Sequence, residues 1–204
     1  MTDPLTLPSN AGYGEAADVL VEQYESVDFT EVHRDVLHLF PAEPSVIADI
    51  GAGSGRDAAA LAARGHRVTA VEPTAELRRL GQLRHAERDI EWVDDALPEL
   101  AVLRAGDRRF DLVLLTAVLM HLAQAERESA MERIAGLLAP NGRLVLSLRH
   151  GPVPAGRRMF PVSAQETIEL AGRHGLALAH HSEREDPLGR GEVRWSYLGL
   201  RRTP

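Results

Sequence analysis

The chain contains no cysteine, so disulfides, thiolate nucleophiles and cysteine metal sites are excluded. It also lacks lysine, which excludes Schiff-base chemistry and any mechanism that needs a lysine general base. His180 and His181 are neighbours on an expected strand and would point to opposite faces, and no cluster of His, Asp and Glu has the spacing of metal ligands. We therefore expect no metal in the functional site.

Long hydrophobic runs are also missing. No segment approaches the roughly 18 apolar residues of a membrane span, and residues 1–10 lack the pattern of a secretory leader. The formal net charge of −7 argues against broad, nonspecific binding to nucleic acid or to an anionic membrane, although it leaves room for a local basic patch. We expect a cytoplasmic protein whose partner is neither a membrane nor a nucleic acid, and both a monomer and a homodimer remain open.

A length of 204 residues with 44% hydrophobic content is sufficient for one domain with a substantial core. Apolar residues recur at helical spacing over residues 16–24 and 32–40, and Pro41 and Pro44 then interrupt the pattern. Residues 1–45 are therefore predicted to form an N-terminal helical segment that precedes the main part of the domain.

A glycine-rich stretch organises the remainder of the chain. Residues 46–50 are apolar and partly β-branched, which predicts a buried strand that carries Asp49 and leads into the turn Gly51-Ala52-Gly53. The alanine-rich segment 56–64 predicts a helix that ends at Gly65, and residues 68–71 predict a second strand. This βαβ unit implies a parallel sheet.

The spacing of the glycines narrows the choice of ligand. Gly51, Gly53 and Gly55 form Gly-x-Gly-x-Gly, which differs from the Gly-x-Gly-x-x-Gly of dinucleotide-binding turns. Asp49 would repel a pyrophosphate and favour a cationic or amino-bearing ligand. Glu72 follows at about the 20-residue offset expected of an acid that accepts hydrogen bonds from ribose hydroxyls. The pattern favours a nucleoside ligand that is not a dinucleotide.

Further helices and strands alternate along the chain. Helices are predicted over 75–86, 125–138 and 163–174, and Ser163 and Glu166 form a capping box at the start of the last. Strands are predicted over 90–93, 110–115, 143–147, 177–181 and 193–200. Asn141 stands in the turn before the strand at 143, where asparagine tolerates a left-handed conformation.

The stretch Asp49-Ile50-Gly51-Ala52-Gly53-Ser54-Gly55 closely resembles motif I of the class I S-adenosylmethionine (SAM)-dependent methyltransferases. The pair Asp95-Ala96 resembles the adenine-binding position of that family, and segments 110–122 and 138–144 are similar to its later motifs. The resemblance covers roughly residues 46–202. It implies an α/β fold with a doubly wound, mostly parallel seven-stranded sheet, helices on both faces and an N-terminal helical lid.

The resemblance also implies SAM as the methyl donor, S-adenosylhomocysteine as the product, and a SAM-binding domain over residues 46–204. The carboxyl ends of the strands form the ligand site in such sheets. The implied cofactor-binding residues are Asp49, Gly51, Ala52, Gly53, Arg56, Glu72, Asp95, Ala96 and Thr116.

The methyl acceptor is expected beside the segments that follow the fourth and fifth strands. His121 and His150 are candidate general bases there, although methyl transfer does not always need a base. The alternative for His121 is that it packs beneath a helix. In related proteins the N-terminal helices often cover the substrate pocket, so Tyr13 and Tyr24 either belong to such a lid or pack on the sheet.

Arg149, Arg157 and Arg158 concentrate positive charge in an acidic protein. They either pair with surface carboxylates or bind an anionic group of the acceptor.

Three functions remain open at this point: a small-molecule methyltransferase, a methyltransferase for RNA or protein, and a SAM-binding regulator without catalysis. The short chain and its net acidity favour the first. Some methyltransferases that act on amino groups carry an Asn-Pro-Pro-Tyr motif after the fourth strand, but residues 115–118 of this chain read Leu-Thr-Ala-Val. Without cysteine the chain has no nucleophile for methylation of a pyrimidine carbon, and without lysine it has no lysine-based tetrad for methylation of a ribose oxygen. We therefore expect a methyltransferase that acts on a small molecule, with an anionic acceptor as one alternative.

Overall fold

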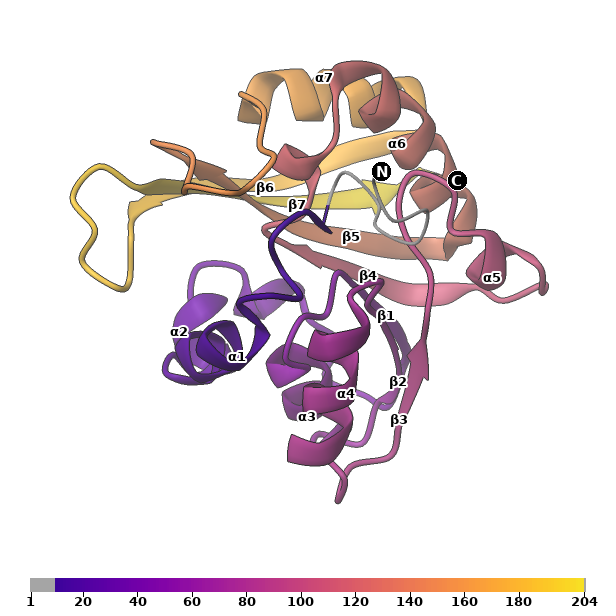
Figure 1. Ribbon diagram of the computed structural model, residues 1–204. Helices are drawn as coiled ribbons and strands as arrows, with labels where there is room; N and C mark the ends of the chain where they lie inside the picture. The colour runs from indigo at the N-terminus through magenta and orange to yellow at the C-terminus, as the bar shows by residue number, and fades with distance from the viewer. Residues whose placement is uncertain (1–9, 204) are drawn as a thin grey trace.

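The computed structural model describes residues 10–203 and contains a seven-stranded sheet in the order β3-β2-β1-β4-β5-β7-β6 (Figure 1). β7 pairs in antiparallel register with β5 and β6, whereas the other neighbouring strands are parallel. The prediction of a mostly parallel seven-stranded α/β sheet is confirmed. The strands are β1 Val46–Ile50, β2 Arg67–Val71, β3 Ile90–Val93, β4 Phe110–Thr116, β5 Leu138–His150, β6 Leu176–Glu185 and β7 Arg194–Arg202.

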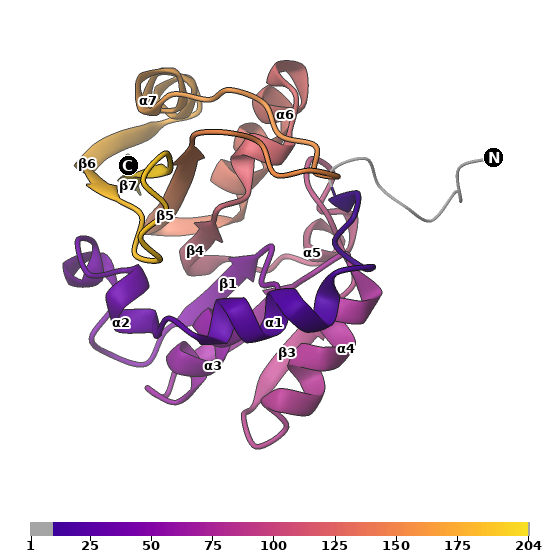
Figure 2. The ribbon, with the colours of Figure 1, turned by 60° about the vertical axis from the view of Figure 1, so that its left-hand side comes forward.

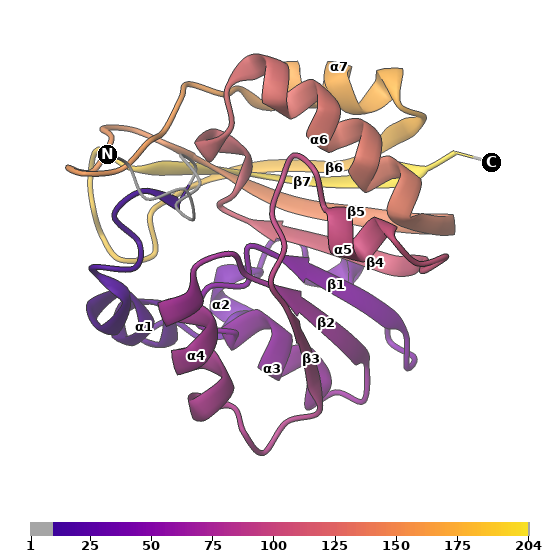
Figure 3. The same cartoon turned by 45° about the vertical axis from the view of Figure 1, so that its right-hand side comes forward.

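Helices cover both faces of the sheet, with α6 and α7 on one side and α3 and α4 on the other (Figure 3). The helices are α1 Ala17–Glu25, α2 Phe29–Val32, α3 Arg56–Ala62, α4 Ala75–Arg84, α5 Ala101–Arg104, α6 Gln124–Leu137 and α7 Ala164–Arg173, with 3-10 turns η2 Leu37–Leu39 and η3 Leu119–His121.

The central strands are buried on both faces, because successive side chains alternate between two hydrophobic clusters. Val113 and Leu115 of β4 belong to the cluster that includes α6 and α7. Leu112 and Leu114 belong to the cluster that includes α3 and the aromatic side chains of the N-terminal segment. This double burial explains why β4 reads as a continuous apolar run.

The N-terminal segment differs in part from its predicted form. α1 is helical as expected and lies alongside α4 (Figure 2), where Ala17 and Val21 pack on Leu77. The helix predicted over 32–40 is wrong. Asp28 caps the amide of Glu31, so α2 begins before residue 32, and it ends after one turn where the buried side chain of His33 turns toward α3.

Predictions for the second half of the chain agree more closely with the structure. The hydroxyl of Ser163 accepts a hydrogen bond from the amide of Glu166 and caps α7 as predicted. Asn141 has a φ of 62°, in the left-handed region. β5 is longer than expected at both ends, because Leu138 pairs with Phe110 of β4 and residues 148–150 pair with β7.

The order of the strands reverses between β1 and β4, which lie side by side at the centre of the sheet. In open α/β sheets, ligands bind beyond the carboxyl ends of the strands at such a reversal. Among residues 10–203, no helix is both long and apolar enough to cross a bilayer. The stretch in which the sequence shows no leader pattern lies almost entirely outside the described residues.

Candidate active site

A cavity of about 410 Å³ lies at this reversal, and residues from the N-terminal segment and from the loops after β5 and β6 complete its wall. Twelve of the predicted site residues line it, and three do not: Asp95, His150 and Arg158. The twelve are Tyr13, Asp49, Gly51, Ala52, Gly53, Arg56, Glu72, Ala96, Thr116, His121, Arg149 and Arg157.

The glycine turn after β1 forms the floor of the cavity. Gly51 has a φ of 76°, and a Cβ on it would lie 2.6 Å from the Val118 side chain, so only glycine fits there. The amides of Gly51 and Ala52 donate to the carbonyl of Val71, which holds the turn against the end of β2. The turn is therefore packed between Val118 and the end of β2 where it lines the cavity.

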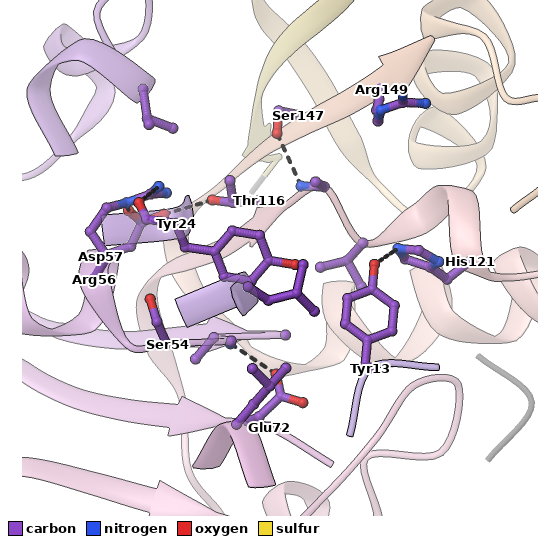
Figure 4. A pocket seen from close by; sticks show the side chains of 18 of the residues that line it. Tyr13, Tyr24, Ser54, Arg56, Asp57, Glu72, Thr116, His121, Ser147 and Arg149 are labelled. Atoms are coloured by element: carbon purple, nitrogen blue, oxygen red, sulfur yellow. Dashed lines mark hydrogen bonds and ion pairs between the residues drawn. The ribbon is translucent and has the colours of Figure 1, made fainter. Parts of the chain in front are cut away.

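Glu72 follows β2 and is almost fully buried. Its carboxylate accepts hydrogen bonds from the amides of Gly53 and Thr74, each at 2.8 Å (Figure 4). Burial raises its pKa, and the two amides oppose that shift. Each carboxylate oxygen has a second lone pair, so Glu72 can hold the turn and still accept bonds from ligand hydroxyls.

Asp49 at the end of β1 is only 2% exposed, and its Oδ2 has no hydrogen-bond partner among the described residues. Burial, with the nearby negative charges of Asp57 and Glu72, raises the pKa of Asp49 well above its usual range. A buried acceptor without a partner costs free energy. A positively charged ligand group in the cavity would remove that cost.

Asp57 at the start of α3 is the centre of a buried polar network that the sequence analysis missed. Its carboxylate accepts hydrogen bonds from His33 at 2.9 Å, from Arg56 at 2.7 Å and from Thr116 at 2.8 Å. Arg56 also donates to the carbonyl of Tyr24 in α1. The side chains of Arg56 and Thr116, predicted to bind the cofactor, thus connect α3 to β4 and to the N-terminal segment (Figure 4).

The Asp94-Asp95-Ala96 segment reaches the cavity through Ala96 and not through either carboxylate. The carboxylate of Asp95 accepts hydrogen bonds from the amides of Ala96, Val102 and Leu103, all at 2.9 Å, and so caps the short α5. Asp94 is exposed and pairs with Arg78. The structure therefore does not bring Asp95 to the cavity, because the amides of its own segment occupy its oxygens.

The part of the cavity beyond β4 contains His121 and Tyr13, whose Nε2 and hydroxyl oxygen are 3.0 Å apart (Figure 4). Nδ1 of His121 lies 2.8 Å from the carbonyl oxygen of Arg158. Burial is the main cause that lowers the pKa of His121, and Arg157, Arg149 and Arg158 lower it further. Tyr24 of α1 also lines the cavity, and its ring lies beside Gly53 of the glycine turn.

The three predicted arginines separate into two groups. Arg149 and Arg157 line the cavity, and neither forms an ion pair within residues 10–203. The guanidinium of Arg157 lies over the ring of Tyr13, 3.7 Å from its centroid. Arg158 pairs with Glu126 outside the cavity, at 3.2 Å. Pairing with a carboxylate therefore occurs for Arg158, whereas binding of an anionic group stays a prediction for Arg149 and Arg157.

His150 faces away from the cavity because side chains alternate along β5, where Ser147 and Arg149 point inward. Its Nε2 lies 2.8 Å from the hydroxyl of Ser196 on the neighbouring strand β7. The structure therefore does not bring His150 to the predicted catalytic position. Because successive side chains of a strand point to opposite faces, the sequence alone could have predicted that His150 and Arg149 face different sides of the sheet.

The sequence analysis also did not predict that the loop between β6 and β7 lines the cavity. Asp186 is buried at the cavity wall and pairs with Arg190 at 2.7 Å and with the indole N–H of Trp195 at 2.8 Å. Because Asp186 and Arg190 carry opposite charges, their ion pair adds no net charge to the cavity wall. The turn sequence Asp-Pro-Leu-Gly at 186–189 was the available signal, but nothing in it indicates that the loop reaches the cavity.

Replacing Asp57 with Asn should destabilise the fold by about 3 to 5 kcal/mol, because a buried cation loses its partner. The Arg56 charge, followed by His33, holds the pKa of Asp57 below its usual range. Its contribution is therefore present above the unfolded pKa of about 4 and is lost as the pH falls through the lower folded value. Urea unfolding at several pH values measures this. Glu91→Gln, which breaks the exposed pair with Arg108, is the control and should cost at most about 1 kcal/mol; equal costs would contradict the prediction.

Comparisons with known proteins agree with this geometry. Residues 48–146 match the family model described as a methyltransferase domain. A methyltransferase of uncharacterized activity from Mycobacterium tuberculosis is 34% identical over 128 residues, which are 59% of this chain and 62% of the relative. The cypemycin N-terminal methyltransferase of a Streptomyces species is 27% identical over 87% of this chain and 75% of its own.

A solved structure is similar over the whole chain. The 1,6-didemethyltoxoflavin-N1-methyltransferase of Burkholderia thailandensis, bound to 1,6-didemethyltoxoflavin and S-adenosylhomocysteine, is 26% identical. The alignment covers 100% of this chain and 94% of that one, with a TM-score of 0.64. Together with the strand order, the glycine turn and the acids at the ends of β1 and β2, these likenesses show that residues 48–146 form a methyltransferase domain and that the chain has the fold of the class I SAM-dependent methyltransferases.

Proposed function

We propose that this protein transfers a methyl group from SAM to a small-molecule acceptor that carries an anionic group. The observation behind the acceptor class is that Arg149 and Arg157 line the cavity and form no ion pair within residues 10–203, although the chain has a net charge of −7. Burial, and then the positive charge of Arg190, lower the pKa of Arg149. An anion beside Arg149 would relieve this repulsion.

The residues at the opposite end of the cavity fit SAM. The Oδ2 atom of Asp49 is a buried acceptor without a partner, suited to the ammonium or sulfonium of the donor. Glu72 has free lone pairs for ribose hydroxyls, and the turn at residues 51–53 lines the cavity beside it. The amide of Ala96 is the candidate contact to the nucleobase.

When bound, SAM supplies an electrophilic methyl group on a positively charged sulfur. The chain's own contribution is to hold the acceptor in line with that methyl group and to exclude water, which can supply much of the rate acceleration. A cavity of about 410 Å³ covered by Tyr13 and Tyr24 is in the size range of small-molecule sites. Its cover favours a small molecule over a folded macromolecule.

A peptide amino terminus is a second candidate acceptor. The observation that favours it is the likeness to the cypemycin N-terminal methyltransferase, which extends over most of both chains. The arginines of the cavity favour an anion over an ammonium, so we rank this candidate second.

The test is a transfer assay with methyl-labelled SAM. The purified protein is offered, separately, a pool of acidic metabolites, a pool of neutral and basic metabolites, peptides with free amino termini, tRNA and bulk protein. We expect label in the acidic pool. Label confined to the peptides would support the second candidate, and label in tRNA or bulk protein would contradict a small-molecule acceptor. SAM binding by calorimetry without any transfer would indicate a regulator.

Arg149→Gln should raise the Michaelis constant for the labelled acceptor about tenfold and leave SAM affinity within about twofold. A charge-assisted bond contributes roughly 1.5 to 3 kcal/mol, and a contact to a remote anion acts equally on ground and transition states. The matched control is Arg158→Gln, because Arg158 pairs with Glu126 outside the cavity. If the two variants have the same steady-state kinetic constants, Arg149 does not take part in binding the acceptor.

Asp49→Asn should weaken SAM binding by about tenfold or more and stabilise the ligand-free protein, because it removes an ionisable group whose burial is costly. Since the folded pKa of Asp49 is raised, its carboxyl favours folding at low pH and loses that advantage as the pH rises through the folded value. The stability gain of the variant should therefore widen above about pH 4. Thermal melts at pH 5 and pH 8, with calorimetry of SAM, measure both effects. An equal gain at the two pH values would contradict the assigned cause.

A further inference from the structure

The hydrogen bond between Tyr13 and His121 joins two distant parts of the chain at the acceptor end of the cavity. Tyr13 precedes α1, and His121 ends η3 after β4. Both side chains line the cavity, and Tyr13 is predominantly buried there. The bond is therefore placed beside the region where the acceptor must lie.

The direction of this bond follows from the other nitrogen of the imidazole. Nδ1 of His121 lies 2.8 Å from the carbonyl oxygen of Arg158, and a carbonyl oxygen can only accept. Nδ1 therefore carries the proton. In the neutral ring Nε2 then holds a lone pair, so the Tyr13 hydroxyl donates its proton to Nε2.

The surroundings keep the imidazole neutral before reaction. The charged groups that face His121 are Arg149 at the end of β5 and Arg157 and Arg158 in the loop that follows, and all three lower its pKa, whereas the bond from Nδ1 to the Arg158 carbonyl opposes that shift. Burial, the largest cause, also lowers this pKa. Tyr13 faces Arg157, Arg149, Glu72 and Tyr24, and its own burial keeps the phenol protonated.

The lone pair of His121 is thus not directed at the acceptor, because the Tyr13 hydroxyl occupies it. Tyr13 oxygen remains able to accept a hydrogen bond from an acceptor hydroxyl or amine. The Arg157 guanidinium over the Tyr13 ring favours negative charge that develops on the phenol during proton transfer. A Cβ on Gly12 would lie 2.7 Å from the Gly156 carbonyl oxygen, so the segment that carries Tyr13 packs tightly on this loop.

We propose that Tyr13 is the catalytic residue that receives the proton of the acceptor while it passes its own proton to Nε2 of His121. The inference rests on the proposed function. The acceptor forms its bond to the methyl carbon as the bond from carbon to sulfur breaks, and the electron pair of that bond stays on sulfur. The acceptor proton moves to the Tyr13 oxygen, the phenol proton moves to Nε2, and His121 ends as a cation that later loses a proton to solvent.

A first experiment tests the arrangement without an acceptor. Nitrogen-15 NMR of the histidine side chains, in the protein bound to S-adenosylhomocysteine, should show His121 neutral at pH 7.5 with the proton on Nδ1. Tyr13→Phe removes only the hydroxyl and should shift the Nε2 resonance. A proton on Nε2, or an Nε2 resonance unchanged in Tyr13→Phe, would overturn the relay.

A second experiment compares two probes, 4-hydroxybenzoate and 4-mercaptobenzoate. Both offer a carboxylate to the arginines, but the aromatic thiol is more acidic and ionises at pH 8 without a base. Tyr13→Phe and His121→Asn should each lower kcat for the hydroxyl probe by about 100-fold or more and leave kcat for the thiol probe within about threefold. The Asn side chain keeps a donor for the Arg158 carbonyl, so His121→Asn preserves that contact.

The double variant Tyr13→Phe/His121→Asn should be no slower than either single variant, because residues that act as one unit are not additive. Tyr197→Phe deletes the hydroxyl of another cavity tyrosine, which is bonded to Arg184, and should leave the ratio of the two rates as in the wild type. The proposal is overturned if each single variant loses kcat equally for both probes, or if the losses of the two single variants add in the double variant. Tyr13 would then be a structural part of the lid only. If the wild type methylates neither probe nor any pool, the proposed function fails, while the NMR result still decides the relay.

Discussion

The buried carboxylate of Asp57 is the interaction on which the arrangement of the site depends. It connects α3 through Arg56, β4 through Thr116 and the N-terminal segment through His33. Burying a carboxylate costs free energy that surrounding donors offset, so the bonds to Asp57 favour the packing of these segments against one another. As a consequence, the N-terminal segment that covers the cavity is bonded to α3 beside the glycine turn, although the two are far apart in the sequence.

The charges of the cavity are separated along its length. Asp49 and Glu72 lie where β1 and β2 end, whereas Arg149 lies at the end of β5 and Arg157 in the loop that follows. This separation suits a cationic methyl donor at one end and an anionic acceptor at the other, since each charge attracts its own ligand and repels the other. Arg56 and Thr116 line the same cavity, and their hydrogen bonds to Asp57 hold both side chains in its wall.

The fold could be predicted to a large extent because its signals are local. Glycines at 51, 53 and 55, the capping box at Ser163 and the apolar runs of the central strands each depend on a few consecutive residues. The helix predicted over 32–40 is the instructive exception. Its apolar spacing is real, but the burial of His33 against Asp57 and the cap at Asp28 decided the local structure instead. Tertiary contacts override helix propensity in such short segments.

By itself, the sequence determined the likeness to methyltransferases and the seven-stranded sheet, because the glycine motif and the alternating helix and strand patterns are local signals. Only the tertiary structure decided which polar side chains reach the cavity. Asp95 turns to cap α5, His150 lies on the opposite face of β5 from Arg149, and Arg158 pairs with Glu126. The tertiary structure also joined Tyr13 to His121. The contacts of Tyr13 with His121 and of Arg158 with Glu126 join residues distant in the chain, and no local pattern encodes such contacts.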